Sequence, residues 1–331
     1  MKFKLTSLSR LIPAALVLST AAVQATAAEA GDYPTRAINV VVPFAAGGPT
    51  DNVARALAEA MRPVLGQAMV VENKGGAGGS IGTTQIARAN PDGYNLLLMH
   101  IGFSTAPSLY KNPGYDPKAS FEPIGLVVDV PMTIVARPDF PANNIQELIA
   151  YVKANKDKIN LANAGIGAAS HLCGTMFTKA LGVDLVAVPY KGTAPAMADL
   201  MGKQVDILCD QTTNTTPNIK AGKVKAYAVT SRQRVPTLPD LPTLQEAGLK
   251  DFEVGIWHGM WAPKGTPKPI VDKLVSALQK GIADPAFKER MATLGATVMT
   301  DQANPQALRA KVDQQVPQWA ALFKEAGVEP Q

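Results

Sequence analysis

Residues 44–48 (Phe-Ala-Ala-Gly-Gly) lie where an apolar run ends and a helical pattern begins. The glycines leave backbone N–H groups unobstructed, and the first amides of a helix have no intrahelical acceptor. Because the helix dipole also places partial positive charge at this end, such a junction suits a carboxylate or a phosphate. We therefore predict an anion-binding loop, with an ordinary tight turn as the alternative. Asp51 is expected to cap the helix and shape the loop rather than to contact the anion.

A second junction of this kind occupies residues 165–171 (Gly-Ile-Gly-Ala-Ala-Ser-His). It nearly matches the dinucleotide fingerprint Gly-x-Gly-x-x-Gly, with Asp184 at about the distance of the acid that contacts the ribose. Ser170 replaces the third glycine, however, and nicotinamide cofactors are not expected in an exported protein. We therefore expect no cofactor. We interpret the segment as a second helix N-terminus whose free amides are supplemented by the Ser170 hydroxyl.

Familiar catalytic motifs do not occur in the sequence: there is no Gly-x-Ser-x-Gly elbow, Walker A loop or His-Glu-x-x-His. The three histidines, His100, His171 and His258, are far apart in sequence, which favours hydrogen-bonding roles over a metal site. Cys173 follows His171 by two residues, and on a helix this spacing points the two side chains in different directions. We therefore predict that the protein is not an enzyme and holds no metal.

The first thirty residues are typical of a secretory signal peptide. Lys2, Lys4 and Arg10 precede an apolar stretch over residues 11–23, which ends in alanine-rich candidate cleavage sites. A membrane anchor is the alternative, although the apolar stretch is short for a bilayer. Export to the periplasm would place the chain in an oxidising compartment, where Cys173 and Cys209 could form a disulfide or remain two buried thiols.

The helices and strands around these two junctions must position them. Their pattern along the sequence is that of an α/β protein. Short apolar strands alternate with amphipathic helices, and the end of the chain is helical. Since 331 residues exceed the usual size of one domain, we expect two lobes joined by two crossings. The predicted divisions are a signal peptide over 1–30, a discontinuous domain 1 over 31–132 and 255–331, and domain 2 over 133–254.

The charge of the chain argues against nucleic acid as a partner. The formal net charge is +5, from 32 basic and 27 acidic residues. Removal of residues 1–30 takes away three basic residues and one acidic residue. The small positive net charge that is left is not typical of a nucleic-acid-binding protein.

Motifs spread along the whole chain resemble those of one known family. They include residues 33–36 (Tyr-Pro-Thr-Arg), 41–51, 71–79, 188–192 (Val-Pro-Tyr-Lys-Gly) and 262–267 (Ala-Pro-Lys-Gly-Thr-Pro). In this respect the sequence resembles Bug-type receptors, the periplasmic substrate-binding proteins of tripartite tricarboxylate transporters. The resemblance implies a type II periplasmic-binding-protein fold, in which two α/β lobes close on a ligand. It also implies a small organic carboxylate as ligand, membrane permease subunits as partners and, we expect, a monomeric receptor.

Members of this family bind a carboxylate through main-chain amides and small hydroxyl side chains, and the two junctions match that role. Loops after Met99 and Cys209 would then set specificity. The resulting candidate ligand-binding residues are Phe44, Ala45, Ala46, Gly47, Gly48, His100, Ser104, Gly167, Ala168, Ala169, Ser170, His171, Asp210, Gln211 and Trp257.

The ligand and the final role remain open at this stage. Phe44, Phe103 and Trp257 would favour an aromatic acid such as a phthalate isomer if they line the cleft, whereas citrate-like or short aliphatic acids are the alternative. Asp210 could orient a hydroxyl, bind an amino group or buttress a loop. The rival functions are a periplasmic hydrolase or transferase on the same fold, with Ser170 and His171 as its working pair, and a ligand sensor that feeds a membrane signalling partner.

Overall fold

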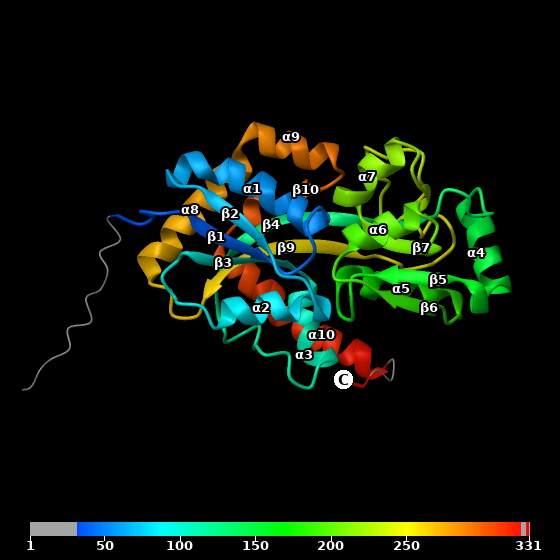
Figure 1. The fold of residues 1–331 in the computed structure, drawn as a ribbon, viewed down its shortest axis with the longest axis horizontal. Coiled ribbons are helices and arrows are strands. Elements are labelled where there is room, and N and C mark those ends of the chain that lie inside the picture. Colours follow the sequence, from blue (N-terminus) through cyan, green and yellow to red (C-terminus); the bar gives the residue numbers. More distant parts are fainter. Residues whose placement is uncertain (1–31, 326–328, 331) are drawn as a thin grey trace, which may run out of the picture. The chain divides into compact units, whose positions relative to one another are not determined.

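The computed structural model describes residues 32–325 and 329–330 (Figure 1). The predicted signal peptide over residues 1–30 lies outside the described residues. Among the described helices, none combines the length and apolar character needed to cross a lipid bilayer.

In the described part of the chain, ten strands form one sheet in the order β2-β1-β3-β9-β4-β7-β5-β6, with β8 and β10 also paired to β4. The strands are β1 (Ile38–Val42), β2 (Met69–Asn73), β3 (Asn95–His100), β4 (Phe121–Ala136), β5 (Asn160–Asn163), β6 (Val186–Pro189), β7 (Ile207–Gln211), β8 (Lys225–Val229), β9 (Gly255–Pro263) and β10 (Thr297–Val298).

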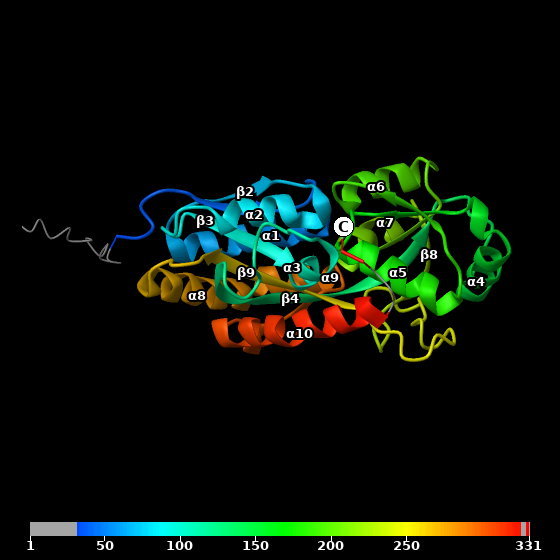
Figure 2. The same cartoon turned by 90° about the horizontal axis from the view of Figure 1, so that it is seen from below.

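The strands β1, β2 and β3 are parallel, and β1 and β3 are almost entirely buried because helices cover both faces. Helices α1, α8 and α9 pack together on one face, while α2, α3 and α10 lie on the other (Figure 1, Figure 2). Their bounds are α1 (Pro49–Leu65), α2 (Ser80–Ala87), α3 (Gly102–Leu109), α8 (Lys268–Ala283), α9 (Pro285–Thr293) and α10 (Pro305–Glu325).

A second strand group is formed by β5, β6, β7 and β8. β5 is parallel to both β6 and β7, whereas β7 and β8 run antiparallel to the end of β4. The helices of this group are α4 (Ile145–Ala154), α5 (Ala169–Leu181), α6 (Thr193–Met201) and α7 (Thr212–Lys220). The Asn144 side chain caps α4 by accepting the Glu147 N–H at 2.9 Å, and Glu147 Oε2 in turn accepts the Asn143 N–H at 2.8 Å.

Two long strands connect the groups. β4 pairs with β9 from Phe121 to Pro131 and then pairs with β7 and β8 from Met132 onward. The first part of β4 could not be predicted from the sequence pattern, because it contains Pro123, Gly125 and Pro131, and proline and glycine are more typical of loops than of strands. The predicted domain boundary after residue 132 falls inside β4, and the one after residue 254 falls at the start of β9. The division into two domains remains a prediction.

Candidate ligand-binding site

A narrow cavity with room for about one water molecule (about 10 Å³) lies between the ends of several strands, where the helices that follow them begin. Its lining comes from both strand groups and consists of Phe44, Pro49, Thr50, His100, Ala164, Ala169, Ser170, Thr193, Asp210 and Gln211. Of the residues that the sequence proposed as a site, the cavity therefore brings together Phe44, His100, Ala169, Ser170, Asp210 and Gln211.

Four helix N-termini meet at this cavity. α1, α5, α6 and α7 each begin at or beside a lining residue, and none of their N-cap residues makes a side-chain capping hydrogen bond. Each helix directs the positive end of its dipole, and amides without helical acceptors, toward its start. An organic anion in the cavity would therefore be stabilised without a cationic side chain.

The first predicted loop is held by Asp51. One carboxylate oxygen accepts the Gly47 N–H and the Arg55 side chain, each at 2.9 Å, and the other accepts Asn73 Nδ2 at 3.0 Å. Asn73 also donates to the Phe44 carbonyl at 3.1 Å. Burial raises the pKa of Asp51, but these hydrogen bonds outweigh it and keep the pKa below its usual value. As expected, Asp51 shapes the loop and does not line the cavity, but the expectation that it caps the helix is wrong, because the N-cap of α1 is Gly48 and Asp51 lies in the first turn.

Several amides of the predicted loops are already engaged in the protein. The Ala45 N–H donates to the Lys191 carbonyl at 3.1 Å, and the Gly167 N–H faces His171 Nδ1 at 3.4 Å. The Ala168 N–H donates to the Gly165 carbonyl at 3.1 Å. The predicted loops thus border the cavity, while the residues that line it lie mostly at the first turns of the helices that follow.

Asp210 brings a carboxylate to the cavity. It is fully buried, and its Oδ2 accepts Asn214 Nδ2 at 2.6 Å. Burial raises the pKa of Asp210 to about 6, although hydrogen bonds from the Asn214 side chain, the Gln211 backbone and the Thr193 hydroxyl lower it. Within the described residues, Gln211 Oε1 is buried and has no hydrogen-bond partner, and Thr193 Oγ1 and Asp210 Oδ1 have none beyond these. Since unpaired buried polar atoms are destabilising by about 1–3 kcal/mol each, this cluster suits a polar ligand that pairs with them.

Ser170 and His171 are not arranged as a nucleophile and its base. Ser170 Oγ lines the cavity and accepts the Ala164 N–H at 2.8 Å. His171 lies half-buried on α5 with its Nδ1 toward Gly167, and between these two described side chains there is no hydrogen bond. Nor do any three His, Cys, Asp or Glu side chains in the described ranges gather as a metal site.

The structure places nine of the fifteen proposed site residues outside the lining: Ala45, Ala46, Gly47, Gly48, Ser104, Gly167, Ala168, His171 and Trp257. The Trp257 indole N–H donates to Gln315 Oε1 on α10 at 2.7 Å, and Ser104 is buried within α3. Phe103, the other candidate for an aromatic wall, stacks on Trp261 at 4.3 Å in the core. Only Phe44 brings an aromatic ring to the cavity, where it stacks on His100 with the ring centroids 4.6 Å apart.

Sequence reasoning missed Thr50 and Thr193, both buried and both in the lining. Each is the first or second residue of a helix that follows a glycine, so the rule used for the two predicted junctions could have found them.

A disulfide joins two walls of the site. Cys173 on α5 and Cys209 on β7 are bonded, with their Cα atoms 6.1 Å apart. Ser170 lies one helical turn before Cys173, and Asp210 directly follows Cys209. The bond therefore connects two elements that contribute lining residues.

A family model described as the tripartite tricarboxylate transporter family receptor matches residues 53–328. The chain belongs to this receptor family. The family comprises solute-binding receptors rather than enzymes, which agrees with the expectation drawn from the resemblance.

Solved structures support the same assignment. The periplasmic binding protein BugD is 77% identical, with a TM-score of 0.89, and the match covers 90% of this chain and 100% of BugD. MatC from Rhodopseudomonas palustris, solved with bound malate, is 40% identical, with a TM-score of 0.84 and coverage of 88% and 99%. A second R. palustris protein, solved with adipate, is 31% identical, with a TM-score of 0.85 and coverage of 91% and 100%. These matches confirm the predicted periplasmic-binding-protein fold.

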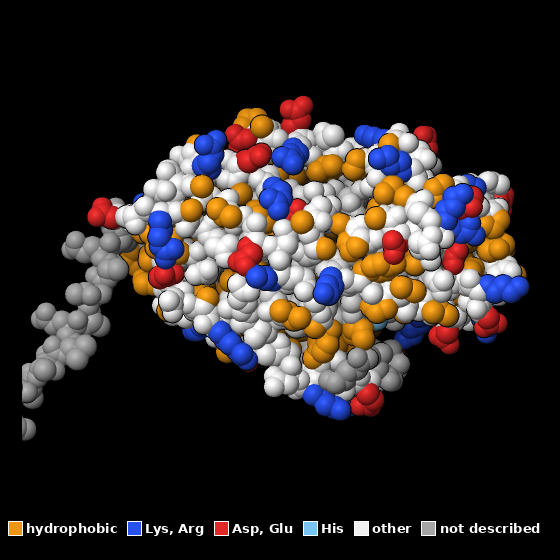
Figure 3. Space-filling model, viewed as in Figure 1, with side chains coloured by type: hydrophobic (Ala, Val, Ile, Leu, Met, Phe, Trp, Pro, Cys, Tyr) orange, Lys and Arg blue, Asp and Glu red, His pale blue; other side chains and the backbone are white. Residues whose placement is uncertain are grey.

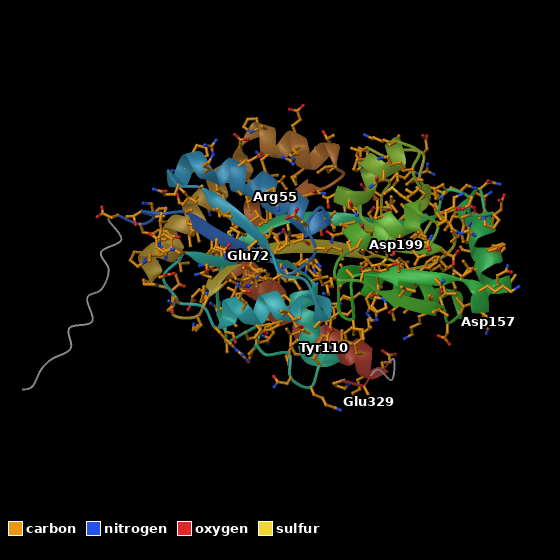
Figure 4. All side chains as sticks on the ribbon, in the orientation of Figure 1. Arg55, Glu72, Tyr110, Asp157, Asp199 and Glu329 are labelled. Carbon is orange, nitrogen blue, oxygen red and sulfur yellow. A yellow bond between two sulfur atoms is a disulfide. The ribbon has the colours of Figure 1, made fainter. Side chains whose placement is uncertain are left out.

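Hydrogen bonds also connect the two strand groups beside the cavity. Besides the bond from Ala45 to Lys191, Thr105 Oγ1 donates to the Gly167 carbonyl at 3.1 Å. The Tyr110 hydroxyl, just after α3 (Figure 4), donates to the Ile166 carbonyl at 2.8 Å. Each of these bonds joins a residue of the β1–β3 side to a residue of the β5–β7 side.

Proposed function

We propose that this protein is an exported solute receptor that binds a small organic carboxylate between two lobes and delivers it to the membrane permease of a tripartite tricarboxylate transporter. The observation that carries the proposal is the cavity itself, where four uncapped helix N-termini meet the buried polar side chains of Thr193, Asp210 and Gln211. Family membership and the malate and adipate bound by two similar proteins support it.

The lining of the cavity favours an aliphatic acid over an aromatic one. Of the three aromatic residues considered, only Phe44 belongs to the lining. The buried carboxylate of Asp210 favours a ligand that carries a donor, which a hydroxyl or an ammonium group next to a carboxylate would supply. We therefore propose a short dicarboxylate with a hydroxyl or amino substituent.

The proposed route to the periplasm begins with residues 1–30 as a signal peptide, and the Cys173–Cys209 disulfide fits an oxidising compartment. On the face shown in Figure 3, basic and acidic side chains are interspersed, which gives no reason to propose a nucleic-acid partner. We propose that the receptor is a monomer and that its partner is a permease rather than a sensor.

Calorimetry on the mature protein, freed of co-purified acids by unfolding and refolding, tests the proposal. The panel contains succinate, L-malate, L-aspartate, adipate, citrate and phthalate. We expect at least one four-carbon acid to bind with a Kd in the micromolar range or below, and phthalate to bind more weakly. Absence of binding by every acid would overturn the receptor function. Hydrolysis or transfer catalysed by the protein and lost in Ser170→Ala would instead support the enzyme alternative.

Transport itself needs a second measurement. Uptake of the bound acid by cells that carry the permease genes should require the receptor. A receptor that binds but does not support uptake would point to the sensor alternative.

A further inference from the structure

Two of the motifs seen in the sequence, residues 71–79 and 188–192, contribute nothing to the lining of the cavity. The first leads from β2 toward α2 and the second leads from β6 to α6, so the two motifs belong to different strand groups. Each contains a glycine beyond the end of its strand, Gly75 in the first and Gly192 in the second. Because glycine has no Cβ atom, it allows another segment of backbone to approach closely.

Both glycines lie against the hydrogen bond that the Ala45 N–H donates to the Lys191 carbonyl. A Cβ atom on Gly75 would lie 2.6 Å from the Lys191 carbonyl oxygen, across the boundary between the two strand groups. A Cβ atom on Gly192 would lie 2.7 Å from the Ala45 nitrogen, across the same boundary in the other direction. Non-bonded carbon atoms prefer separations of about 3.5–4.0 Å, and backbone atoms cannot rotate away as a side chain can. A side chain at either position would therefore push the two groups apart.

The local backbone conformation does not explain these two glycines. Gly192 has a φ of 162°, which is extended backbone that other residues also adopt, and the φ of Gly75 lies outside the left-handed region. Gly78, farther along the first motif, also faces the other group, at the Ile166 carbonyl, but its φ of 58° would strain any side chain. Gly75 and Gly192 are thus the positions where the absence of a side chain serves only the contact between the groups.

We propose that Gly75 and Gly192 are positioning residues for ligand binding, because without side chains they let the two strand groups meet backbone to backbone as the groups close over a carboxylate. The inference rests on the proposed function and deepens it. The cavity has room for about one water molecule, so an organic acid enters only when the residues around it move apart. In such an open form the two loops are separated, and the contacts at Gly75 and Gly192 form on closure. The free energy of these contacts is then part of the affinity for every ligand.

Gly75→Ala and Gly192→Ala test this role by calorimetry with each acid of the panel above that the wild type binds. We expect each variant to weaken all of these acids by a common factor of about 10 or more, because the closed form must accommodate an overpacked contact. Without ligand, and in buffers free of carboxylates, each variant should unfold at the wild-type temperature or slightly above it. The reason is that alanine restricts the unfolded chain, while the open form contains no clash.

Gly202→Ala is the matched control. Gly202 ends α6 with a φ of −78°, and a Cβ atom there would face only the Ala198 and Asp199 carbonyls of its own helix. This variant should leave the affinity for every acid unchanged.

The outcomes separate this inference from the proposed function. If the wild type binds no acid of the panel, both are overturned. If the wild type binds but either glycine variant keeps its affinity, or loses affinity for only some of the acids, only the role of the glycines is overturned. The same holds if a ligand-free variant unfolds several degrees below the wild type, because the contact would then belong to the fold without ligand.

A measurement on the wild type remains decisive even if neither variant folds. Small-angle X-ray scattering of the mature protein should show a smaller radius of gyration when a panel acid saturates it, because the two loops meet only on closure. In Gly75→Ala the decrease should be smaller at the same fractional saturation. A radius that does not change in the wild type, or an equal decrease in folded Gly75→Ala, would overturn the proposal.

Discussion

At the scale of single residues, we expect Asp210 to select the substituent that the ligand carries. Its Oδ2 is paired with Asn214 in the buried lining, so replacement by asparagine keeps the shape and removes the charge. We expect Asp210→Asn to weaken L-aspartate more than L-malate, by about 10-fold or more, because only the ammonium group gains from a full negative charge. Succinate should change little.

Isothermal titration with the three acids measures this effect, and Asp184→Asn is a charge-matched control because Asp184 is exposed and lies outside the lining. Equal losses for all three acids would show that Asp210 only buttresses the loop.

Protonation of Asp210 and protonation of His258 should have opposite effects on the free energy of unfolding as the pH falls. The pKa of Asp210 is raised from 3.8 to about 6, so folding favours the protonated acid, and lowering the pH from 7 to 4 stabilises the fold through Asp210. Burial lowers the pKa of His258 from 6.5 to about 3, so folding favours the neutral ring, and stability is lost as the pH falls below 6.5. Each effect has a slope of roughly 1.4 kcal/mol per pH unit within its window.

We therefore expect Asp210→Asn to steepen the loss of stability between pH 6.5 and 4, and His258→Gln to flatten it. Urea unfolding at each pH measures both, in buffers without carboxylates because acetate or citrate could occupy the cavity. A profile that either variant shifts in the opposite direction would contradict the assignment of the charge states.

At this scale the sequence predicted some residues and not others. Ser170 could be proposed because it begins a helix after a glycine-containing loop, and Asp210 because it stands at the end of an apolar strand. Trp257 could not be excluded, since only the packing of β9 against α10 shows that its indole pairs with Gln315. His258 was not proposed for a related reason: its place opposite His100 arises from the cross-strand register of β3 and β9.

At the scale of elements, glycines precede three of the four helix junctions, and two of these, before α1 and α5, were proposed from the sequence. The α7 junction has no such mark, since Gln211 and Thr212 connect β7 directly to the helix. The course of β4 was also hidden, because its prolines and glycine are tolerated by pairing partners far away in the sequence. Fold class could thus be predicted from local pattern, whereas the convergence of the junctions depends on long-range pairing.

The disulfide is the element-scale feature that we expect to matter most for stability. It closes a loop with a sequence separation of 36 between α5 and β7. Chain-entropy arguments predict that Cys173→Ala with Cys209→Ala destabilises the protein by about 4 kcal/mol. Affinity should fall as well, because the start of α5 and the end of β7 both contribute lining residues.

Urea unfolding with and without reductant measures this prediction. The wild type should lose stability in reductant, while the double variant, which has no thiols, should be insensitive to it. Detection of two free thiols in the unfolded, unreduced wild type would contradict it.

At the scale of the whole molecule, ligand binding should be coupled to closure of the two lobes. The bonds from Thr105 to Gly167 and from Tyr110 to Ile166 join α3 and its C-terminal neighbour to the loop before α5. Neither residue lines the cavity, so these bonds bear on the closed state without contacting the ligand. A ligand shifts the equilibrium between open and closed forms only by its difference in affinity for the two. Weakening the closed form should therefore lower apparent affinity for every ligand.

We expect Tyr110→Phe to weaken all the acids that bind by a common factor of about 5, the equivalent of roughly 1 kcal/mol for one hydrogen bond. This uniform loss contrasts with the selective loss expected for Asp210→Asn, because the change lies in the population of the closed form and not in a ligand contact. Stopped-flow fluorescence should show the loss mainly as faster dissociation. Tyr115→Phe is the matched control, since its hydroxyl donates to the Phe103 carbonyl on the same side of the cavity and should affect stability alone. If Tyr110→Phe changed the order of preference among the acids, the residue would have to act on the ligand itself, and the separation between closing contacts and recognition contacts would not hold.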